Sequence, residues 1–477
     1  RDVERSRGLG DVYKRQKAME AIKEMEESKT KQQLFSKEDL KKLIVPLLFE
    51  QALAITVGMA DTVMISSAGE AAVSGVSLID MFNNLIISVL AALATGGAVV
   101  TSQFLGAGKK EDACKSAKQL IVSSVCITIG ISILVMVFCN GIISLFFGKI
   151  EADVFHNAVI YMMISALSFP FLALYNSCAA LFRSMGNSQI TLKVSVVENI
   201  INIGGNALGV YVLGLGVAGV AIPSLISRAV AGFILYRLLK NPSNEVHLLK
   251  ESFHIDWPVI HKIFYIGIPS GIENGIFQLG RVIVVSIIAG FGTVQIAANG
   301  VANSLDSMGC IVGQAMNLAM ITVIGRCVGA GDSGQVRYYT KKLLKITYLC
   351  TFMVNSVILL CLSWILKCYG LSPETTQLSY ILVMIHNGMA MFLWPASFVL
   401  PNMLRACNDV RFTMVLSIFS MFVFRIGFSY IIGVNMGYGA IGVWIAMVLD
   451  WIFRVICFVS RYLSGHWLKT ARLQDNR

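Results

Sequence analysis

Residues 46–69 read PLLFEQALAITVGMADTVMISSAG, an apolar stretch that carries two acids, Glu50 and Asp61. A helix of about 20 apolar residues crosses the roughly 30 Å hydrocarbon core of a bilayer, and this stretch is long enough to do so. A carboxylate inside such a helix is costly, and it is by default a candidate functional group with a partner or a wet cavity nearby. For Asp61 taken alone, an interfacial acid near a helix end explains the pattern equally well.

The composition is that of an integral membrane protein. Of the 477 residues, 56% are hydrophobic and 14% are charged, and the mean hydropathy is +0.70; soluble domains have roughly 25% charged residues. The net charge of +11 comes mainly from basic residues between the apolar spans, so it indicates membrane topology and no nucleic-acid partner. The 11 cysteines form no C-x-x-C pair, so neither a disulfide framework nor a zinc site is expected.

Apolar runs recur to the end of the chain, and each is long enough to cross the membrane. They predict an all-α integral membrane protein with twelve transmembrane helices at about 43–66, 72–103, 119–147, 154–182, 190–213, 217–238, 260–289, 294–325, 340–366, 376–403, 410–433 and 439–462. The alternating ten-residue strands of a β-barrel are absent from the sequence. No cleavable signal peptide is expected, because the first apolar run is too long and follows a charged segment.

Basic residues concentrate in the loops after even-numbered spans, for example Lys109 and Lys110 after the second and Arg405 and Arg411 after the tenth. The odd loops contain only Lys149 and Lys367 as basic residues. The positive-inside rule therefore places both termini in the cytoplasm of a multi-pass protein of the cell (inner) membrane.

The second half of the chain repeats the first at an offset of 223 residues. Pro46 and Glu50 recur as Pro269 and Glu273, and Gly69 recurs as Gly292. Six crossings per repeat give both halves the same orientation, so we expect two six-helix bundles related by a pseudo-two-fold axis along the membrane normal. Parallel repeats of this kind hold a binding cavity between bundles that rock against each other, which favours a transporter over a channel.

These boundaries predict five regions. A cytoplasmic N-terminal segment covers 1–42, of which 1–16 resemble translated adapter sequence and 17–42 a polar surface helix. The N-terminal bundle covers 43–240, a cytoplasmic linker 241–259, the C-terminal bundle 260–463 and a cytoplasmic tail 464–477. A monomer in contact with membrane lipid is expected.

Several motifs together resemble the multidrug and toxic compound extrusion family over residues 43–470. They are GMADTVM from Gly58, GAGK at 106–109, LFRSMGNS at 181–188, NIINIGGNALGVYVLGLGVAGVAIP at 199–223, LRACNDVRFT at 404–413 and GVWIAMVLDWIFR at 442–454. The resemblance implies a secondary transporter that expels amphiphilic, often cationic compounds, driven by sodium ions or protons, with no cofactor.

Depth along the helices predicts a cation-coupling site. At 1.5 Å per residue, Asp61, Asn202, Asn206 and Ser224 lie within about 8 to 16 Å of the outer surface, in one layer, and Glu198 continues the stripe of Asn202 one turn inward. Such oxygens suit sodium, and a desolvated carboxylate equally suits a proton. The resemblance implies the same place, although relatives often have aspartate where this chain has Asn206. Polar residues that only bond helices together are the alternative.

Glu50 and Glu273, with Gln278 and Arg281 beyond the latter, are predicted to line the substrate cavity, where the acids would attract cations. A pair of Glu273 with Arg281, or another pair between the bundles, that only locks a closed state is the alternative. No ion site is carried over to the second bundle.

Three further intramembrane groups have structural interpretations or none. Asp450 and Arg454 are spaced for an i, i+4 pair, Arg425 needs a partner or reaches for the interface, and His386 is interpreted as a packing residue.

The alternative within transport is a lipid-linked saccharide or lipid flippase of the same superfamily, which usually has extra spans and a more basic cavity. A membrane-embedded transferase would need clustered Asp or His motifs, so no enzyme is expected.

Overall fold

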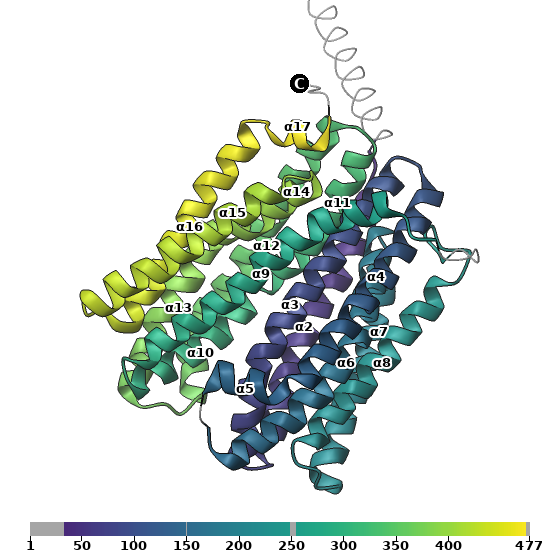
Figure 1. Cartoon of the computed structure of the whole chain (residues 1–477). Helices are drawn as coiled ribbons and strands as arrows, with labels where there is room; N and C mark the ends of the chain where they lie inside the picture. The colour runs from purple at the N-terminus through teal and green to yellow at the C-terminus, as the bar shows by residue number, and fades with distance from the viewer. Residues whose placement is uncertain (1–32, 149, 249–253, 474–477) are drawn as a thin grey trace, which may run out of the picture. The chain divides into compact units, whose positions relative to one another are not determined.

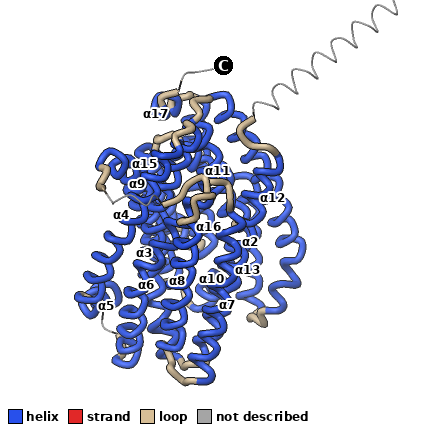
Figure 2. The backbone as a smooth tube through the Cα atoms, turned by 90° about the vertical axis from the view of Figure 1, so that its right-hand side faces the viewer, coloured by secondary structure: helices blue, strands red, loops and turns tan. Residues whose placement is uncertain are grey.

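The computed structural model describes residues 33–148, 150–248 and 254–473, and every regular element within them is a helix (Figure 1, Figure 2). The adapter-like residues 1–16, most of the expected surface helix, and part of the predicted linker lie outside the described residues.

The chain divides into two compact units, Arg1–Lys41 and Lys42–Arg477. In the first unit the described residues open α2 (Lys37–Ser66) with a capping pair. The Ser36 hydroxyl accepts from the amide of Asp39 at 3.1 Å, and the Asp39 carboxylate accepts from the amide of Ser36 at 2.9 Å. This reciprocal bonding satisfies amides that have no partner within the helix.

The second unit contains both predicted bundles, and their division at the linker stays a prediction. Its first half consists of the rest of α2, then α3 (Glu70–Gly106), α4 (Lys110–Val137), the short α5 (Cys139–Phe147), α6 (Ala152–Ser184), α7 (Ser188–Ala207) with a π-helical extension (Leu208–Val212), and α8 (Ala218–Leu239). The predicted third span 119–147 was wrong at its end, because the helix stops at Val137 and α5 is separate.

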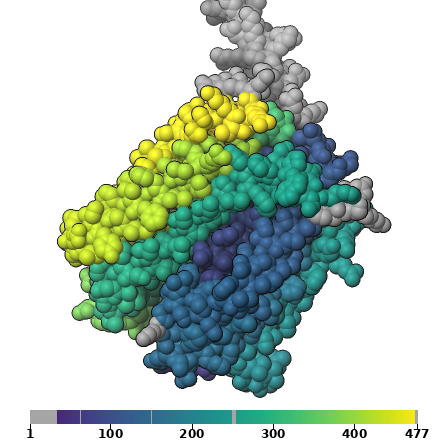
Figure 3. Space-filling model, in the orientation of Figure 1, coloured from purple at the N-terminus to yellow at the C-terminus, as the bar shows by residue number. Residues whose placement is uncertain are grey.

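The second half begins with α9 (Trp257–Ala289), α10 (Thr293–Gly309) and α11 (Ile311–Gly329). It continues with α12 (Ser333–Cys368), α13 (Pro373–Trp394), a π-helical turn (Pro395–Val399), α14 (Leu400–Ala406), α15 (Val410–Ser420), two π-helical segments (Met421–Gly427 and Ser429–Asn435), α16 (Gly439–Leu463) and α17 (Trp467–Ala471). In Figure 3 the two halves, coloured purple to teal and teal to yellow, lie side by side.

Eleven helical stretches of the described residues are long and apolar enough to cross a membrane. The fifth predicted span is helical too, but it is more polar, with Lys193, Glu198 and three asparagines in α7, and it is not one of the eleven. Large apolar side chains such as Leu360 and Trp364 of α12 are exposed, as a lipid-facing surface requires. The all-helical membrane fold is therefore confirmed.

The backbone repeats along with the sequence. Gly69 and Gly292 precede α3 and α10 with φ of 100° and 101°, and Gly108 and Gly331 follow α3 and α11 with φ of 73° and 75°. Side chains with a Cβ rarely adopt these left-handed angles, so the glycines fix equivalent turns in both halves.

The two halves meet mainly where α3 crosses α9 and α11. A Cβ on Gly106 would lie 2.0 Å from the carbonyl oxygen of Arg326, and one on Gly329 would lie 1.9 Å from that of Gln103. Gly106 and Gly329 are repeat equivalents, so the crossing is itself symmetric. It brings the backbones together at this end, which we call the joined end.

The interface continues along α3 and α9 as far as Gln278, whose amide donates to the Ser88 hydroxyl at 3.1 Å. Beyond that point α3 packs within its own half, where Asn83 donates to Ser165 of α6 at 3.2 Å. Gly280 of α9 likewise packs against Met421 of the second half. Among the described residues, the contacts between the halves therefore concentrate toward the joined end.

Candidate functional site

A chain of hydrogen bonds joins the four residues that depth alone grouped in one layer. The amide of Asn206 donates to the Asp61 carboxylate at 2.7 Å and to the side-chain oxygen of Asn202 at 3.2 Å. The amide of Asn202 in turn donates to the Ser224 hydroxyl at 2.9 Å. The structure thus brings α2, α7 and α8 together at Asp61.

Close packing of α7 on α8 positions this chain. A Cβ on Gly205 would lie 2.6 Å from the Pro223 ring, and Gly209 and Gly219 face each other at backbone contact. Because glycine allows the helix axes to approach, the short side chain of Ser224 reaches Asn202. Asn202 and Asn206 share a helix face, being four residues apart.

One acceptor at the centre of this chain is unsatisfied. The side-chain oxygen of Asn206 is buried and has no hydrogen-bond partner among the described residues, although its amide is fully used. Buried polar atoms normally have partners. An oxygen in this position, next to the Asp61 carboxylate, suits a small cation that takes oxygen ligands.

Sequence reasoning missed the groups around Asp61. Asp80 of α3 and Arg228 of α8 both interact electrostatically with Asp61. The Tyr161 hydroxyl donates to Asp80 at 2.9 Å, and Arg228 donates to the Ser168 hydroxyl at 2.7 Å. Both Asp80 and Arg228 are ionisable residues inside apolar spans, and this is the one signal in the sequence from which they could have been found.

Glu198 is separate from the hydrogen-bonded chain. It is half-buried on α7, four residues before Asn202, and its electrostatic partners are Arg228 and Glu50. It therefore lies between the Asp61 cluster and the ion pair of Glu50, and its membership of the coupling site stays a prediction.

Glu50 and Glu273 are buried and each is paired with an arginine of its own half. Glu50 lies 2.5 Å from the Arg183 guanidinium and accepts from the Thr191 hydroxyl at 3.0 Å. Glu273 lies 2.7 Å from Arg405. Each pair lies inside one half, so neither is the pair between the bundles that would lock a closed state, and the partner of Glu273 is Arg405 and not Arg281.

The four predicted cavity residues do not share one wall. Gln278 bonds Ser88 at the interface, as described, and Arg281 is exposed. A cavity of about 80 Å³ between the halves is lined by four alanines, Leu318 and Ile321, together with the polar Thr95, Asn176, Arg183 and Thr322. In it, the guanidinium partner of Glu50 faces the space between the halves, and the substrate role of the two acids stays a prediction.

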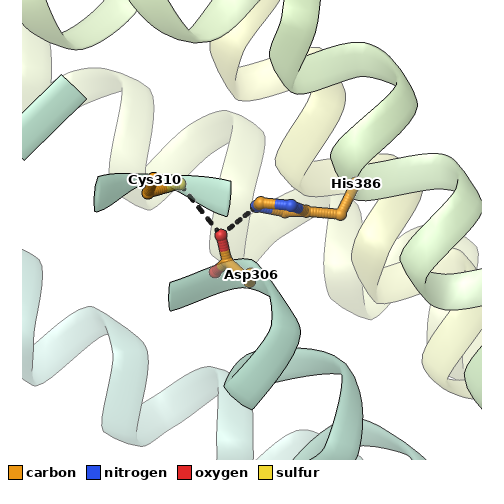
Figure 4. A group of neighbouring side chains, drawn as sticks. All are labelled: Asp306, Cys310 and His386. Atoms are coloured by element: carbon orange, nitrogen blue, oxygen red, sulfur yellow. Dashed lines mark hydrogen bonds and ion pairs between the residues drawn. The ribbon is translucent and has the colours of Figure 1, made fainter. Parts of the chain in front are cut away.

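A second buried polar cluster lies in the second half, where α10 ends and α11 begins (Figure 4). Asp306 lies 2.7 Å from the Nε2 atom of His386 on α13 and accepts from the Cys310 thiol at 3.1 Å. The interpretation of His386 as a packing residue was therefore wrong, although Trp444 and Trp451 do pack edge-on against its ring. The break between α10 and α11 falls inside the predicted span 294–325, which was expected to be one continuous helix.

The predicted pair of Asp450 and Arg454 makes no direct salt bridge, although Asp450 does interact electrostatically with Arg454. Asp450 accepts from the Ser420 hydroxyl and faces Arg425 at 3.8 Å, whereas Arg454 lies 3.9 Å from Glu273. The direct contacts of Asp450 and Arg454 therefore reach to other helices and do not run along α16. Charged groups that are buried or partly buried need an opposite charge at close range, and neighbouring helices supply it here.

The fold and the buried ionisable clusters define a multi-pass membrane protein made of two repeats. The sequence profile of the MatE family matches residues 46–208 and again 269–431, at the same offset of the repeat. The chain belongs to the MatE family of transporters.

Similar proteins cover nearly the whole chain. An uncharacterized transporter, YisQ of Bacillus subtilis, is 28% identical over 89% of this chain and 93% of its own length. A probable multidrug resistance protein, NorM of Thermotoga maritima, is 24% identical over 92% and 95%. An outward-facing multidrug resistance MATE family transporter superposes with a TM-score of 0.81 at 20% identity, over 91% of this chain and 96% of that one. Members of this family are transporters and not enzymes.

Proposed function

We propose that this transporter is a secondary active exporter of amphiphilic, often cationic organic compounds, which it exchanges for protons or sodium ions by alternating access. The observation that carries the proposal is the chain of Asp61, Asn206, Asn202 and Ser224 inside the first half. A partly buried carboxylate next to an unsatisfied amide oxygen is a site that a cation would occupy and leave. The names of the relatives support multidrug substrates.

The coupling follows from linkage between the cation and the solute. A cation on Asp61 neutralises its charge, and a cationic solute in the cavity between the halves then loses an attractive partner. Coupling requires that cation and solute favour different states or compete for one. Asp61 would carry the cation, while Asn206, Asn202 and Ser224 would hold its carboxylate in place, with Glu198 as an acid one turn away.

The site supports sodium and proton differently. Asp61 and the oxygen of Asn206 suit sodium, which takes oxygen ligands. Because Asn206 of α7 is neutral, the hydrogen-bonded group holds a single carboxylate, that of Asp61 on α2, and one proton neutralises it. Asp80 is nearby, but Tyr161 already bonds to it. Both coupling ions therefore remain in the proposal, and imposed gradients separate them.

We place the joined end, with Gly106 and Gly329, in the cytoplasm, because Lys109, Lys110 and Arg337 lie at the turns after these glycines and in the first turns of the helices that follow. With this orientation the halves meet on the cytoplasmic side, as in an outward-facing state. We further propose that residues 43–240 and 260–463 form the two bundles and that the segments before, between and after them lie in the cytoplasm. The protein would be a monomer in the inner cell membrane. A lipid or saccharide flippase is not favoured by the family match.

Transport in everted membrane vesicles tests the proposal. We would follow a fluorescent organic cation while imposing a sodium gradient or a proton gradient separately, for the wild type and for Asp61→Asn. Wild-type transport should respond to one of the gradients. Asp61→Asn should still bind the fluorescent cation, but its rate of gradient-driven transport should fall at least about tenfold. Asn199→Asp is the control for an altered charge, because Asn199 lies on α7 with Asn202 and Asn206 but takes no part in the hydrogen bonds to Asp61.

Two results would contradict the proposal separately. Unchanged gradient-driven transport in Asp61→Asn would remove Asp61 from coupling while leaving the exporter intact. Transport that ignores both gradients in the wild type would remove the exchange mechanism itself.

A further inference from the structure

A cavity of about 540 Å³ lies between the two halves at the joined end. Gln103 and Phe104 of α3 form its first-half wall, and His261, Lys262 and Tyr265 of α9 form its second-half wall together with Arg472 beyond α17. None of the mechanism proposed above uses this cavity.

The cavity is basic. Lys262 and Arg472 carry positive charges, and no acidic residue is among the described residues that line it. Arg411 adds a further charge nearby, because its guanidinium lies 5.4 Å from the centre of the Tyr265 ring. A pocket of this charge disfavours the cationic solutes of the proposed transport and selects anions.

The same cavity also has an apolar side. Val100, Ile266 and Val328 line it, and the Lys262 ammonium lies 5.4 Å from the centre of the Phe104 ring. Trp257, at the start of α9, is 69% exposed, and exposed tryptophans are typical of the membrane interface. An anion that suits these walls has a charged head and an apolar body.

We propose that this cavity binds the phosphate-bearing headgroup of an anionic phospholipid from the cytoplasmic leaflet. Basic pockets between transmembrane helices on the cytoplasmic side have the chemistry that recognises such headgroups. Lys262 and Arg472 contact the phosphate oxygens, the amide of Gln103 bounds the pocket on the opposite side, and the apolar wall takes the start of an acyl chain. Only the sidedness rests on the proposed orientation; the binding chemistry does not.

Binding here links the halves. Gln103 and Phe104 belong to the first half, whereas Lys262 and Arg472 belong to the second, so the lipid contacts both only when they are joined. A ligand that binds one arrangement better shifts the population toward it by its differential affinity. Anionic lipid therefore favours the state with the joined end closed.

Native mass spectrometry of the detergent-solubilised full chain tests the site. We would titrate short-chain phosphatidylglycerol, phosphatidylcholine and inorganic phosphate against the wild type, Lys262→Gln, Arg472→Gln and the double variant. Each lost charge should weaken phosphatidylglycerol binding about fivefold, and the double variant about 25-fold. Lys109→Gln, an exposed lysine at the same end that does not line the cavity, should bind as the wild type does.

The three ligands separate the sources of the phosphate. Binding of phosphatidylglycerol that phosphate does not displace, and that falls in the variants, identifies the lipid headgroup. Binding of inorganic phosphate that falls equally in the variants supports the same anion site but assigns it to a soluble phosphate. Equal binding of phosphatidylcholine, or full phosphatidylglycerol affinity in the double variant, overturns the proposal while leaving the exporter proposal untouched.

Discussion

Glu50 and Arg183 form a buried ion pair in which a carboxylate oxygen lies 2.5 Å from a guanidinium nitrogen. The pair ties the first helix of its half to the end of α6. Glu273 and Arg405 repeat the same tie in the second half, at 2.7 Å. A contact present in both repeats serves the architecture that they share. The Asp61 cluster differs in this respect, because the residue equivalent to Asp61 in the second half is Val284.

Removing one partner of the Glu50 pair should destabilise the protein strongly. Arg183→Met leaves a buried carboxylate with Thr191 as its remaining partner, and such a loss costs about 3 to 5 kcal/mol. The double variant Glu50→Gln/Arg183→Met should recover much of this cost. Thermal unfolding of the purified protein measures both, and Glu111→Gln, from an exposed pair with Lys115, is the control with little effect. Additive losses in the double variant would show that Glu50 and Arg183 do not stabilise the protein as a pair.

Asn206→Asp should shift the coupling site toward sodium. The new carboxylate would stand where the Asn206 amide now lies 2.7 Å from Asp61, and two like charges there favour a bound cation. We expect the sodium concentration for half-maximal transport to fall about tenfold. Efflux measured against sodium at constant pH reports it, with Asn199→Asp as the matched variant. No change in sodium dependence would show that Asn206 does not contact the ion.

Gly329→Ala should loosen the joined end. The added Cβ would lie 1.9 Å from the carbonyl oxygen of Gln103, so α11 must move from α3 at a cost of about 1 to 3 kcal/mol. Alkylation of the buried thiol of Cys407, followed by peptide mass spectrometry, should become faster. Gly130→Ala, whose Cβ meets nothing within 4 Å, should change neither stability nor alkylation.

Asp306→Asn should destabilise the second half. His386 is almost fully buried and its Nε2 atom would lose a charged partner at 2.7 Å, which in a buried pair costs about 3 kcal/mol. Cys310→Ser keeps a donor toward Asp306, so its effect on thermal unfolding should be under about 1 kcal/mol. An equal loss in both variants would show that the cluster is held by packing and not by the contact between Asp306 and His386.

The sequence by itself determined the class of fold. Apolar runs of about twenty residues must form helices in a bilayer, because only a helix satisfies its own backbone groups there. The pair Gly69/Gly292 marks the repeat in the sequence alone, and its two backbone angles agree. Helical rise and spacing also grouped Asp61 with Asn202, Asn206 and Ser224, because depth along a straight helix is linear in residue number.

Only the tertiary structure decided the partners of buried charges. Spacing along one helix predicts a pair of Asp450 with Arg454 and allows one of Glu273 with Arg281. In the packed structure the salt bridges instead join Asp450 to Arg425 and Glu273 to Arg405. A buried charge selects the nearest opposite charge in space, and helix rotation and crossing, which residue spacing along one helix does not encode, decide which side chain that is. The same rotation brought His386 to Asp306 and Asp80 to Tyr161.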